Sequence, residues 1–163
     1  MNDPVLSDLG GSAARVLAAA EALGLAIRVM EMPASTRTAE EAAAACGCAV
    51  GEIVKSLVFQ GAVSGRPYLL LVAGCNRVDE AAMGEVVGEA LERMPGKAVR
   101  TVTGFAIGGI APFGHATALE VFLDADLLGH ERVWAAAGTP HAVFAVDPQA
   151  LAAAVGARVV RMG

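Results

Sequence analysis

The chain is poor in lysine and in long apolar runs, and each shortage excludes a class of protein. Only Lys55 and Lys97 are lysines among its 12 basic residues, and the formal net charge is −5. Proteins that hold nucleic acids by bulk electrostatics cluster Lys and Arg, so any contact with a nucleic acid must here be local, weak or assisted. No apolar run approaches the roughly 18 residues that a membrane span needs, and we expect no membrane partner.

Cysteine is also scarce, and its spacing excludes the common metal sites. Cys46 and Cys48 are separated by one residue and Cys75 stands apart, whereas structural zinc sites use paired arms of the C-x₂-C type. We interpret the three as reduced thiols of a cytoplasmic protein that uses no metal or cofactor. The alternative is a redox or metal role for Cys46 and Cys48. Residues 1–8 lack a basic region ahead of an apolar core, so we expect a short tail there and no signal peptide.

Length and pattern predict one α+β domain over residues 1–163. A chain of 163 residues can bury a core without disulfides, and it has no internal repeat, low-complexity linker or change of composition. Periodicity and cap residues predict helices over residues 12–23, 38–47, 80–88 or 80–93, 95–102 and 148–155. Alternation and β-branched residues predict strands over residues 26–31, 53–59, 67–73, 118–123, 133–137, 142–146 and 158–160. This order indicates a curved mixed β-sheet with helices packed outside it.

Glycines and a proline interrupt the apolar segment from Gly104 to His115. Its four glycines make it a poor helix and a poor strand, and Pro112 prevents the chain from rejoining a regular element. Such a loop leaves backbone N–H groups uncovered, and these can hold a carbonyl oxygen or an anion. The alternative is a hydrophobic turn between two elements, because short glycine patterns are weak motifs.

Lys55 is the second landmark, because it interrupts an otherwise apolar strand. Alternation places Ile53, Lys55, Leu57 and Phe59 on one face and Ser56 on the other. A lysine in this position either reaches solvent at a sheet edge or points into a pocket that requires an ammonium group. The strand pattern alone leaves both explanations open.

Together these stretches resemble the YbaK family, the domain shared by free-standing aminoacyl-tRNA deacylases and the editing insertion of bacterial prolyl-tRNA synthetases. Residues 54–59 are similar to the family's lysine-bearing strand, and residues 108–112 match its Gly-x-x-x-Pro loop. Further similar segments follow in family order: Arg77-Val78-Asp79, Pro112-Phe113-Gly114, residues 138–144 and residues 151–160. The resemblance covers residues 12–162.

The resemblance implies a partly barrel-like mixed β-sheet with peripheral helices, and it favours the shorter helix 80–88 followed by a strand at residues 91–93. It also implies a hydrolase that edits mischarged aminoacyl-tRNA, with tRNA for proline carrying a small amino acid such as Cys or Ala as the expected substrate. The 3′ acceptor end of the tRNA is then the partner, prolyl-tRNA synthetase is a candidate second partner, and DNA is not expected. The candidate site residues are Lys55, Gly108, Gly109, Ile110, Ala111, Pro112 and His141.

Hydrolysis of such an ester needs a nucleophilic water, donors for the tetrahedral oxyanion and a hold on the terminal adenosine. The N–H groups of residues 108–111 fit the second task. Lys55 fits the third task, or a contact with the substrate carbonyl. No Ser-His-Asp arrangement is recognisable, and Ser56 lies on the strand face opposite Lys55, so a covalent acyl-enzyme is the lesser alternative.

The three histidines carry weaker expectations. His141 lies between two predicted strands and is the best candidate for orienting the water or the amino-acid moiety, and the equal alternative is an exposed turn residue. His115 either lines the mouth of a pocket or faces water. His130 has the sequence context of a turn residue.

Two other functions fit the same residues. A non-catalytic module would bind an aminoacyl-adenosine-like ligand or a synthetase, and charged tRNA would then stay intact. A small-molecule esterase or amidase would instead hydrolyse substrates that lack tRNA.

Overall fold

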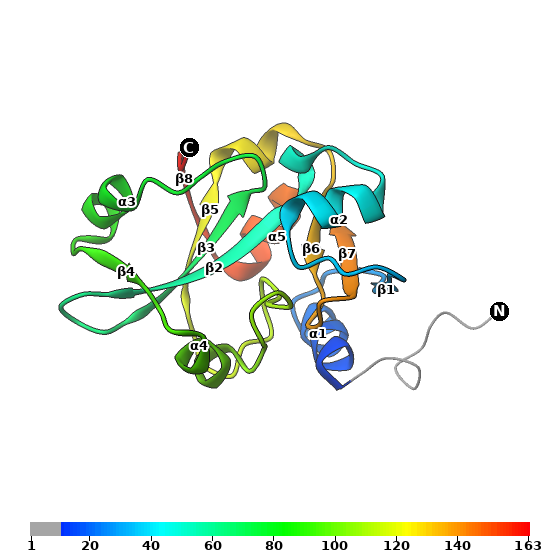
Figure 1. Cartoon of the computed structure of the whole chain (residues 1–163), viewed down its shortest axis with the longest axis horizontal. Helices are drawn as coiled ribbons and strands as arrows, with labels where there is room; N and C mark the ends of the chain where they lie inside the picture. Colours follow the sequence, from blue (N-terminus) through cyan, green and yellow to red (C-terminus); the bar gives the residue numbers. More distant parts are fainter. Residues whose placement is uncertain (1–10) are drawn as a thin grey trace.

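The computed structural model describes residues 11–163 (Figure 1), so the tail expected at residues 1–8 lies outside the described residues. The helices are α1 (Gly11–Ala22), α2 (Ala39–Cys46), α3 (Glu80–Val87), α4 (Gly96–Thr103) and α5 (Pro148–Val155), with 3₁₀ turns η2 (Val50–Glu52) and η3 (Ala125–Gly129). The strands are β1 (Met30–Glu31), β2 (Val54–Gly61), β3 (Pro67–Ala73), β4 (Leu91–Arg93), β5 (Glu120–Asp124), β6 (Val133–Ala136), β7 (Ala142–Val146) and β8 (Arg158–Val160). None of the helices in this range is long and apolar enough to cross a membrane.

The strands form two sheets that meet at one end of β2. The larger sheet has the order β4-β2-β3-β5-β8 and the smaller has the order β1-β7-β6. β2 and β3 form the predicted antiparallel hairpin, whereas β3 with β5 and β5 with β8 run parallel. A bridge between Ile53 and Trp134 joins the two sheets. Helices lie around the outside of the sheets in Figure 1, which confirms the predicted α+β fold with mixed strands and peripheral helices.

Burial along β2 follows the predicted alternation. Val54 and Val58 lie in the largest buried cluster, whereas Phe59 and the half-buried Leu57 pack into a second cluster on the other side of the sheet. On β3, residues 69–72 are fully buried and alternate between the same two clusters. The hairpin therefore separates the two buried clusters, and adjacent side chains on each of its strands pack into different clusters.

Cap residues set the ends of α2 and α3 as predicted, whereas α1 already begins at Gly11, one residue before the predicted start at residue 12. The Thr38 hydroxyl accepts a hydrogen bond from the N–H of Glu41 (3.1 Å), and the Glu41 carboxylate accepts one from the N–H of Thr38 (3.4 Å), which confirms the capping box. Gly88, with a φ of 100°, ends α3 in the left-handed region that favours glycine. The shorter of the two predicted helices is therefore correct, and residues 91–93 form a strand.

The predicted strand over residues 26–31 is wrong for most of its length. Leu25, Ile27 and Val29 do alternate toward the largest buried cluster. Only β1, at Met30–Glu31, has a neighbouring strand to pair with, and that neighbour is β7. Alternation reports which side chains are buried, but a strand also needs a second backbone within hydrogen-bonding distance.

Glu89 fastens the loop of the β2–β3 hairpin to the end of α3. Its carboxylate accepts hydrogen bonds from the N–H groups of Val63 (3.0 Å) and Ser64 (2.8 Å), from the Ser64 hydroxyl (2.6 Å) and from the Tyr68 hydroxyl (3.2 Å). The hydrogen bonds from Ser64, followed by those from Val63 and Tyr68, lower the pKa of Glu89 to about 2. The folded chain therefore favours the ionised carboxylate.

We predict that Glu89→Gln lowers the thermal midpoint at pH 7, because a neutral amide is a weaker acceptor than a carboxylate. A carboxyl group whose pKa is lower in the folded chain stabilises it above the unfolded pKa, about 4.5, and this stabilisation is lost as the pH falls through about 2. The difference in midpoint between wild type and Glu89→Gln, followed by circular dichroism, should therefore narrow between pH 5 and pH 2. Glu92→Gln is the control, because Glu92 accepts a single side-chain bond, from Gln60. A difference that does not change with pH would contradict the prediction.

Candidate functional site

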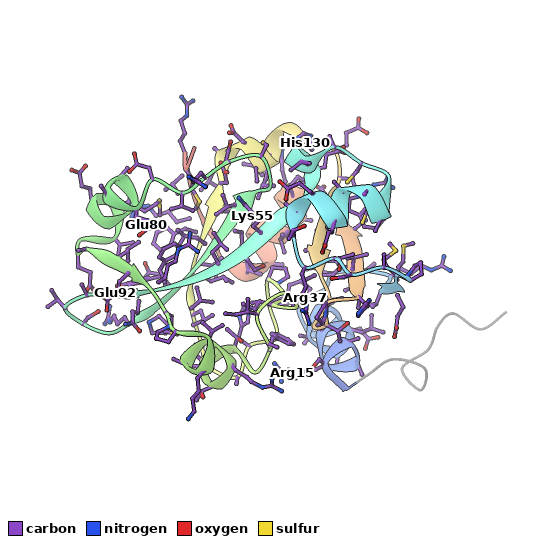
Figure 2. The ribbon with its side chains drawn as sticks, in the orientation of Figure 1. Arg15, Arg37, Lys55, Glu80, Glu92 and His130 are labelled. Atoms are coloured by element: carbon purple, nitrogen blue, oxygen red, sulfur yellow. The ribbon has the colours of Figure 1, made fainter. Side chains whose placement is uncertain are left out.

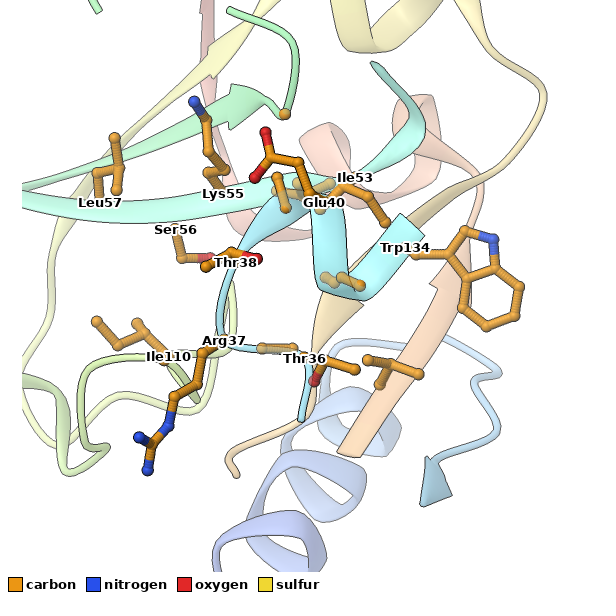
Figure 3. Close-up of a pocket in the computed structure, with 18 of the residues that line it drawn as sticks. Thr36, Arg37, Thr38, Glu40, Ile53, Lys55, Ser56, Leu57, Ile110 and Trp134 are labelled. Carbon is orange, nitrogen blue, oxygen red and sulfur yellow. The ribbon is translucent and has the colours of Figure 1, made fainter. Parts of the chain in front are cut away.

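A cavity of about 350 Å³ lies where the two sheets meet. Its walls come from the loop before α2 and the start of α2, from β2, β6 and β7, and from the glycine loop, defined here as residues 104–115. The close-up in Figure 3 shows side chains from these elements surrounding one space. Segments distant in the sequence are therefore brought together by the junction of the sheets.

Three of the seven candidate residues line this cavity. Lys55 comes from β2, and Gly108 and Ile110 come from the glycine loop. Gly109 and Ala111 are buried in the same loop, next in sequence to the lining residues. The structure thus brings the lysine strand and the Gly-x-x-x-Pro loop to one cavity, although they are more than 50 residues apart in sequence.

Pro112 and His141 do not line the cavity. Pro112 is buried and borders a separate apolar hollow together with His115. His141 is exposed in the turn between β6 and β7, where its N–H donates to the Thr139 hydroxyl (3.2 Å) and its carbonyl oxygen accepts from the N–H of Met32 (2.6 Å). These contacts are those of the exposed turn residue that the sequence allowed as the alternative.

Lys55 is held at the edge of the cavity by the turn that follows β3. Its ammonium group donates to the backbone carbonyl of Asn76. The Asn76 side chain in turn donates to the carboxylates of Asp124 (2.9 Å) and Asp126 (2.7 Å), and Asp124 also accepts from the N–H of Ala73 (3.0 Å). An ammonium group has three N–H donors, so this anchor fixes Lys55 and leaves donors for a ligand.

The glycine loop presents backbone donors without acceptors. Within residues 11–163, the N–H groups of Gly108, Ile110 and Ala111 make no hydrogen bond. Ile110 and Ala111 are buried, at 6% and 0% exposure, and buried N–H groups are nearly always paired in folded proteins. The N–H of Gly109 is different, because it donates to the carbonyl of Ala106 (3.0 Å). The loop can therefore offer donors to the cavity from positions 108 and 110, which line it, but not from 109.

Contacts from α1 and contacts within the loop itself fix the shape of this loop. Arg15 of α1 donates to the carbonyls of Thr103 (2.8 Å) and Gly114 (3.1 Å) at the two ends of the loop, and its guanidinium lies 4.2 Å from the centre of the Phe105 ring. The His115 Nε2 lies 2.7 Å from the carbonyl oxygen of Ala111. Burial lowers the pKa of His115, so at neutral pH the ring is uncharged and donates this bond through Nε2–H.

Polar residues that the sequence analysis did not select also line the cavity. Ser56 contributes a hydroxyl whose oxygen is buried and has no hydrogen-bond partner. Thr36, Arg37 and Thr38 precede α2, and the Thr36 hydroxyl donates to the carbonyl of Pro140 (2.7 Å). In the sequence the residues that precede α2 form a run with several hydroxyl-bearing side chains before a capping box. That pattern predicts a loop and does not by itself indicate a cavity.

Few ionisable groups line the cavity. Among the described residues they are Arg37, Glu40 and Lys55. Figure 2 shows Lys55 and Arg37 on elements that border the cavity, whereas Glu80 and Glu92 lie at the opposite end of the larger sheet. The local charge of the cavity is thus more positive than the formal charge of −5 for the whole chain suggests.

The three cysteines lie outside this cavity, and Cys46 and Cys48 have the properties of structural thiols. Burial, followed by the neighbouring Cys48, raises the pKa of Cys46 to about 11, and burial also raises the pKa of Cys48. Both thiols are therefore protonated at neutral pH, and a protonated thiol is a poor nucleophile and a poor ligand. The part of the chain that the structure describes has no group of three or more His, Cys, Asp or Glu side chains that could hold a metal ion.

We predict that Gly109→Ala destabilises the protein by about 1–3 kcal/mol, the usual effect of overpacking. A Cβ at this position would lie 2.8–2.9 Å from backbone atoms of Thr139, so the glycine loop would have to move away from the β6–β7 turn. Gly129→Ala is the matched control, because a Cβ there meets nothing within 4 Å. Thermal or urea unfolding measures both variants. Equal midpoints for the two would contradict the close packing of Gly109.

Comparison with known proteins places the chain in a wider group. The family model described as "Aminoacyl-tRNA editing domain" matches residues 33–154. The uncharacterized protein YwhH of Bacillus subtilis (strain 168) is 32% identical over 123 residues, which cover 76% of this chain and 78% of that protein.

Two solved structures extend the likeness over nearly the whole chain. The first, described as a proposed trans-editing enzyme for prolyl tRNA synthetase, is 51% identical with a TM-score of 0.89, and the match covers 94% of this chain and 98% of that one. The second, hypothetical protein APE2540, is 30% identical with a TM-score of 0.82, and the match covers 88% of this chain and 95% of that one.

Proposed function

This chain belongs to the aminoacyl-tRNA editing domain family, and we propose that it acts in trans as a deacylase of mischarged aminoacyl-tRNA. We propose tRNA(Pro) carrying a small non-cognate amino acid, such as Cys or Ala, as the substrate. The observation that carries the proposal is one cavity shared by Lys55 and the unpaired N–H groups of the glycine loop. A volume of about 350 Å³ is at the lower end for ligand sites, which suits a small aminoacyl group and its ribose.

In the proposed reaction a water molecule attacks the ester carbonyl, and the resulting oxyanion is held by backbone donors. Gly108 and Ile110 line the cavity with N–H groups that have no acceptor in the described chain. Such preorganised donors stabilise the transition state more than the substrate, because charge develops on the oxygen only as the water adds. Gly109 contributes through its close approach to Thr139 and Pro112 through its fixed φ, and both keep the loop in shape.

Lys55 has a substrate-binding role in this proposal. Its ammonium group is a point charge, and a hydrogen bond to the Asn76 carbonyl holds this group in place. It can donate to an oxygen of the terminal adenosine while it keeps this anchor. His141 is assigned no direct role, since it is exposed outside the cavity wall.

A serine acyl-enzyme is not favoured. A nucleophilic serine needs a base within hydrogen-bonding distance of its hydroxyl. Ser56 is the serine of the cavity wall, and its hydroxyl has no partner of any kind in the described residues. Attack by water therefore accounts better for the groups at hand.

The charge of the chain limits how the tRNA is held. With a formal charge of −5, we propose that residues 1–163 act as one domain that grips only the 3′ acceptor end. Prolyl-tRNA synthetase is the proposed partner that supplies the remaining affinity for the tRNA body. Adding the synthetase should then lower the KM of deacylation without changing the single-turnover rate at saturation.

We predict that the purified protein deacylates tRNA(Pro) charged with Cys or Ala and leaves Pro-tRNA(Pro) intact. The measurement is loss of acid-precipitable labelled amino acid over time, with tRNA charged with Ala, Cys, Ser, Thr or Pro. Intact substrates throughout, at high protein concentration, would favour the non-catalytic binding module. Equal hydrolysis of simple amino-acid esters without tRNA would favour the small-molecule esterase.

We predict that Lys55→Ala lowers the single-turnover rate at subsaturating protein by about tenfold or more, because a hydrogen bond to a charged group contributes about 1.5–3 kcal/mol to binding. The variant loses one hydrogen bond, to the Asn76 carbonyl, so its unfolding free energy should fall by only about 1 kcal/mol. Arg66→Ala is the control, because Arg66 is exposed at the far end of the β2–β3 hairpin. A large loss of stability with an unaltered rate per folded molecule would assign Lys55 to the fold.

A further inference from the structure

Ser56 breaks the rule that buried polar atoms are hydrogen-bonded. Among the described residues, the buried side-chain nitrogen and oxygen atoms without a partner are the Ser56 hydroxyl oxygen and the Trp134 indole nitrogen. Both residues line the cavity between the sheets. The rest of the described chain satisfies its buried polar side chains, so the exceptions coincide with the proposed site.

The unpaired hydroxyl of Ser56 lies on an apolar face of β2. Its neighbours on the same strand face, Val54 and Val58, are buried in the largest core cluster. An alanine or valine at position 56 would suit that face better, because an unpaired buried hydroxyl lowers stability. A buried hydroxyl that makes no hydrogen bond within the fold indicates a ligand that forms this hydrogen bond.

Ser56 and the glycine loop face the same part of the cavity. In Figure 3, Ser56 projects from β2 on the side where Ile110 and Arg37 lie, and Lys55 projects from the other side of the strand. Gly108 and Ile110, whose N–H groups have no acceptor in the described chain, line the same cavity. Hydroxyl and amide donors without partners are thus found on two elements that line one cavity.

We propose that Ser56 is a catalytic residue that donates its hydroxyl hydrogen to the carbonyl oxygen of the aminoacyl ester. The inference rests on the proposed deacylase function and adds a side-chain donor to the backbone donors of the glycine loop. Water adds to the carbonyl carbon, the carbonyl oxygen becomes the oxyanion held by these donors, and the bond to the ribose oxygen then breaks. The ribose oxygen leaves with a proton from the added water, and Ser56 keeps its own proton throughout.

The test compares Ser56→Ala and Ser56→Thr with wild type in single-turnover deacylation of the charged tRNA that wild type hydrolyses fastest. Ser56→Ala should lower the rate at saturation by about tenfold or more, with little change in the protein concentration that gives half the maximal rate. Its thermal midpoint should stay the same or rise, because the variant removes an unpaired buried hydroxyl. Ser56→Thr keeps the hydroxyl and should recover most of the rate.

Thr101→Ala is the matched control for loss of a hydroxyl. The Thr101 hydroxyl is exposed and donates within α4, to the carbonyl of Lys97 (3.1 Å), so this variant should react at the wild-type rate. Three outcomes overturn the inference while the proposed function stands. Ser56→Ala could react at the wild-type rate, or it could have a lowered thermal midpoint with an unchanged rate per folded molecule. The third outcome is that Ser56→Ala and Ser56→Thr are equally slow. Wild-type protein that deacylates no charged tRNA overturns the proposed function and the inference with it.

Discussion

The packing of glycine against backbone at the β6–β7 turn is the constraint on which the cavity depends. Gly109 lies so close to Thr139 that a Cβ there would meet backbone atoms at 2.8–2.9 Å, and a Cβ on Gly138 would lie 2.7 Å from the carbonyl oxygen of Ser12. The turn is therefore enclosed between α1 on one side and the glycine loop on the other. This packing sets the distance between the glycine loop and β2. It therefore also sets the position of the loop's unpaired N–H groups relative to Lys55 and Ser56.

The stability of the fold and the chemistry of the cavity are supplied by different groups. The cores on either side of the β2–β3 hairpin are apolar and fully buried, and the buried Asp124 is satisfied by Ala73 and Asn76. Unpaired donors gather instead at the junction of the two sheets, where they add nothing to folding. A deacylase that works by electrostatic stabilisation needs such donors in place before the substrate arrives, because reorienting them during the reaction would raise the barrier.

Local patterns predicted the parts of this structure that depend on neighbours in sequence. The alternation on β2 and the capping box at Thr38 follow from spacing alone, and the structure confirms both. The stop at Gly88 followed from the family resemblance, because the pattern alone also allowed one helix over residues 80–93. The strand expected over residues 26–31 failed because pairing depends on a distant partner that alternation does not report. Ser56 was visible as a polar residue on an apolar strand face, but whether its hydroxyl was paired depended on what the fold placed opposite it.

The described residues of the cavity wall include no histidine and no cysteine, and this narrows the chemistry that they can perform. The ionisable side chains among them are Arg37, Glu40 and Lys55. General acid–base catalysis in enzymes most often uses histidine, which the described cavity wall lacks. In the proposed hydrolysis negative charge develops on the ester carbonyl oxygen, and donors aimed at that oxygen stabilise it. The unpaired N–H and O–H donors of the cavity meet that need, which is why the cavity is better suited to positioning a carbonyl than to activating a nucleophile.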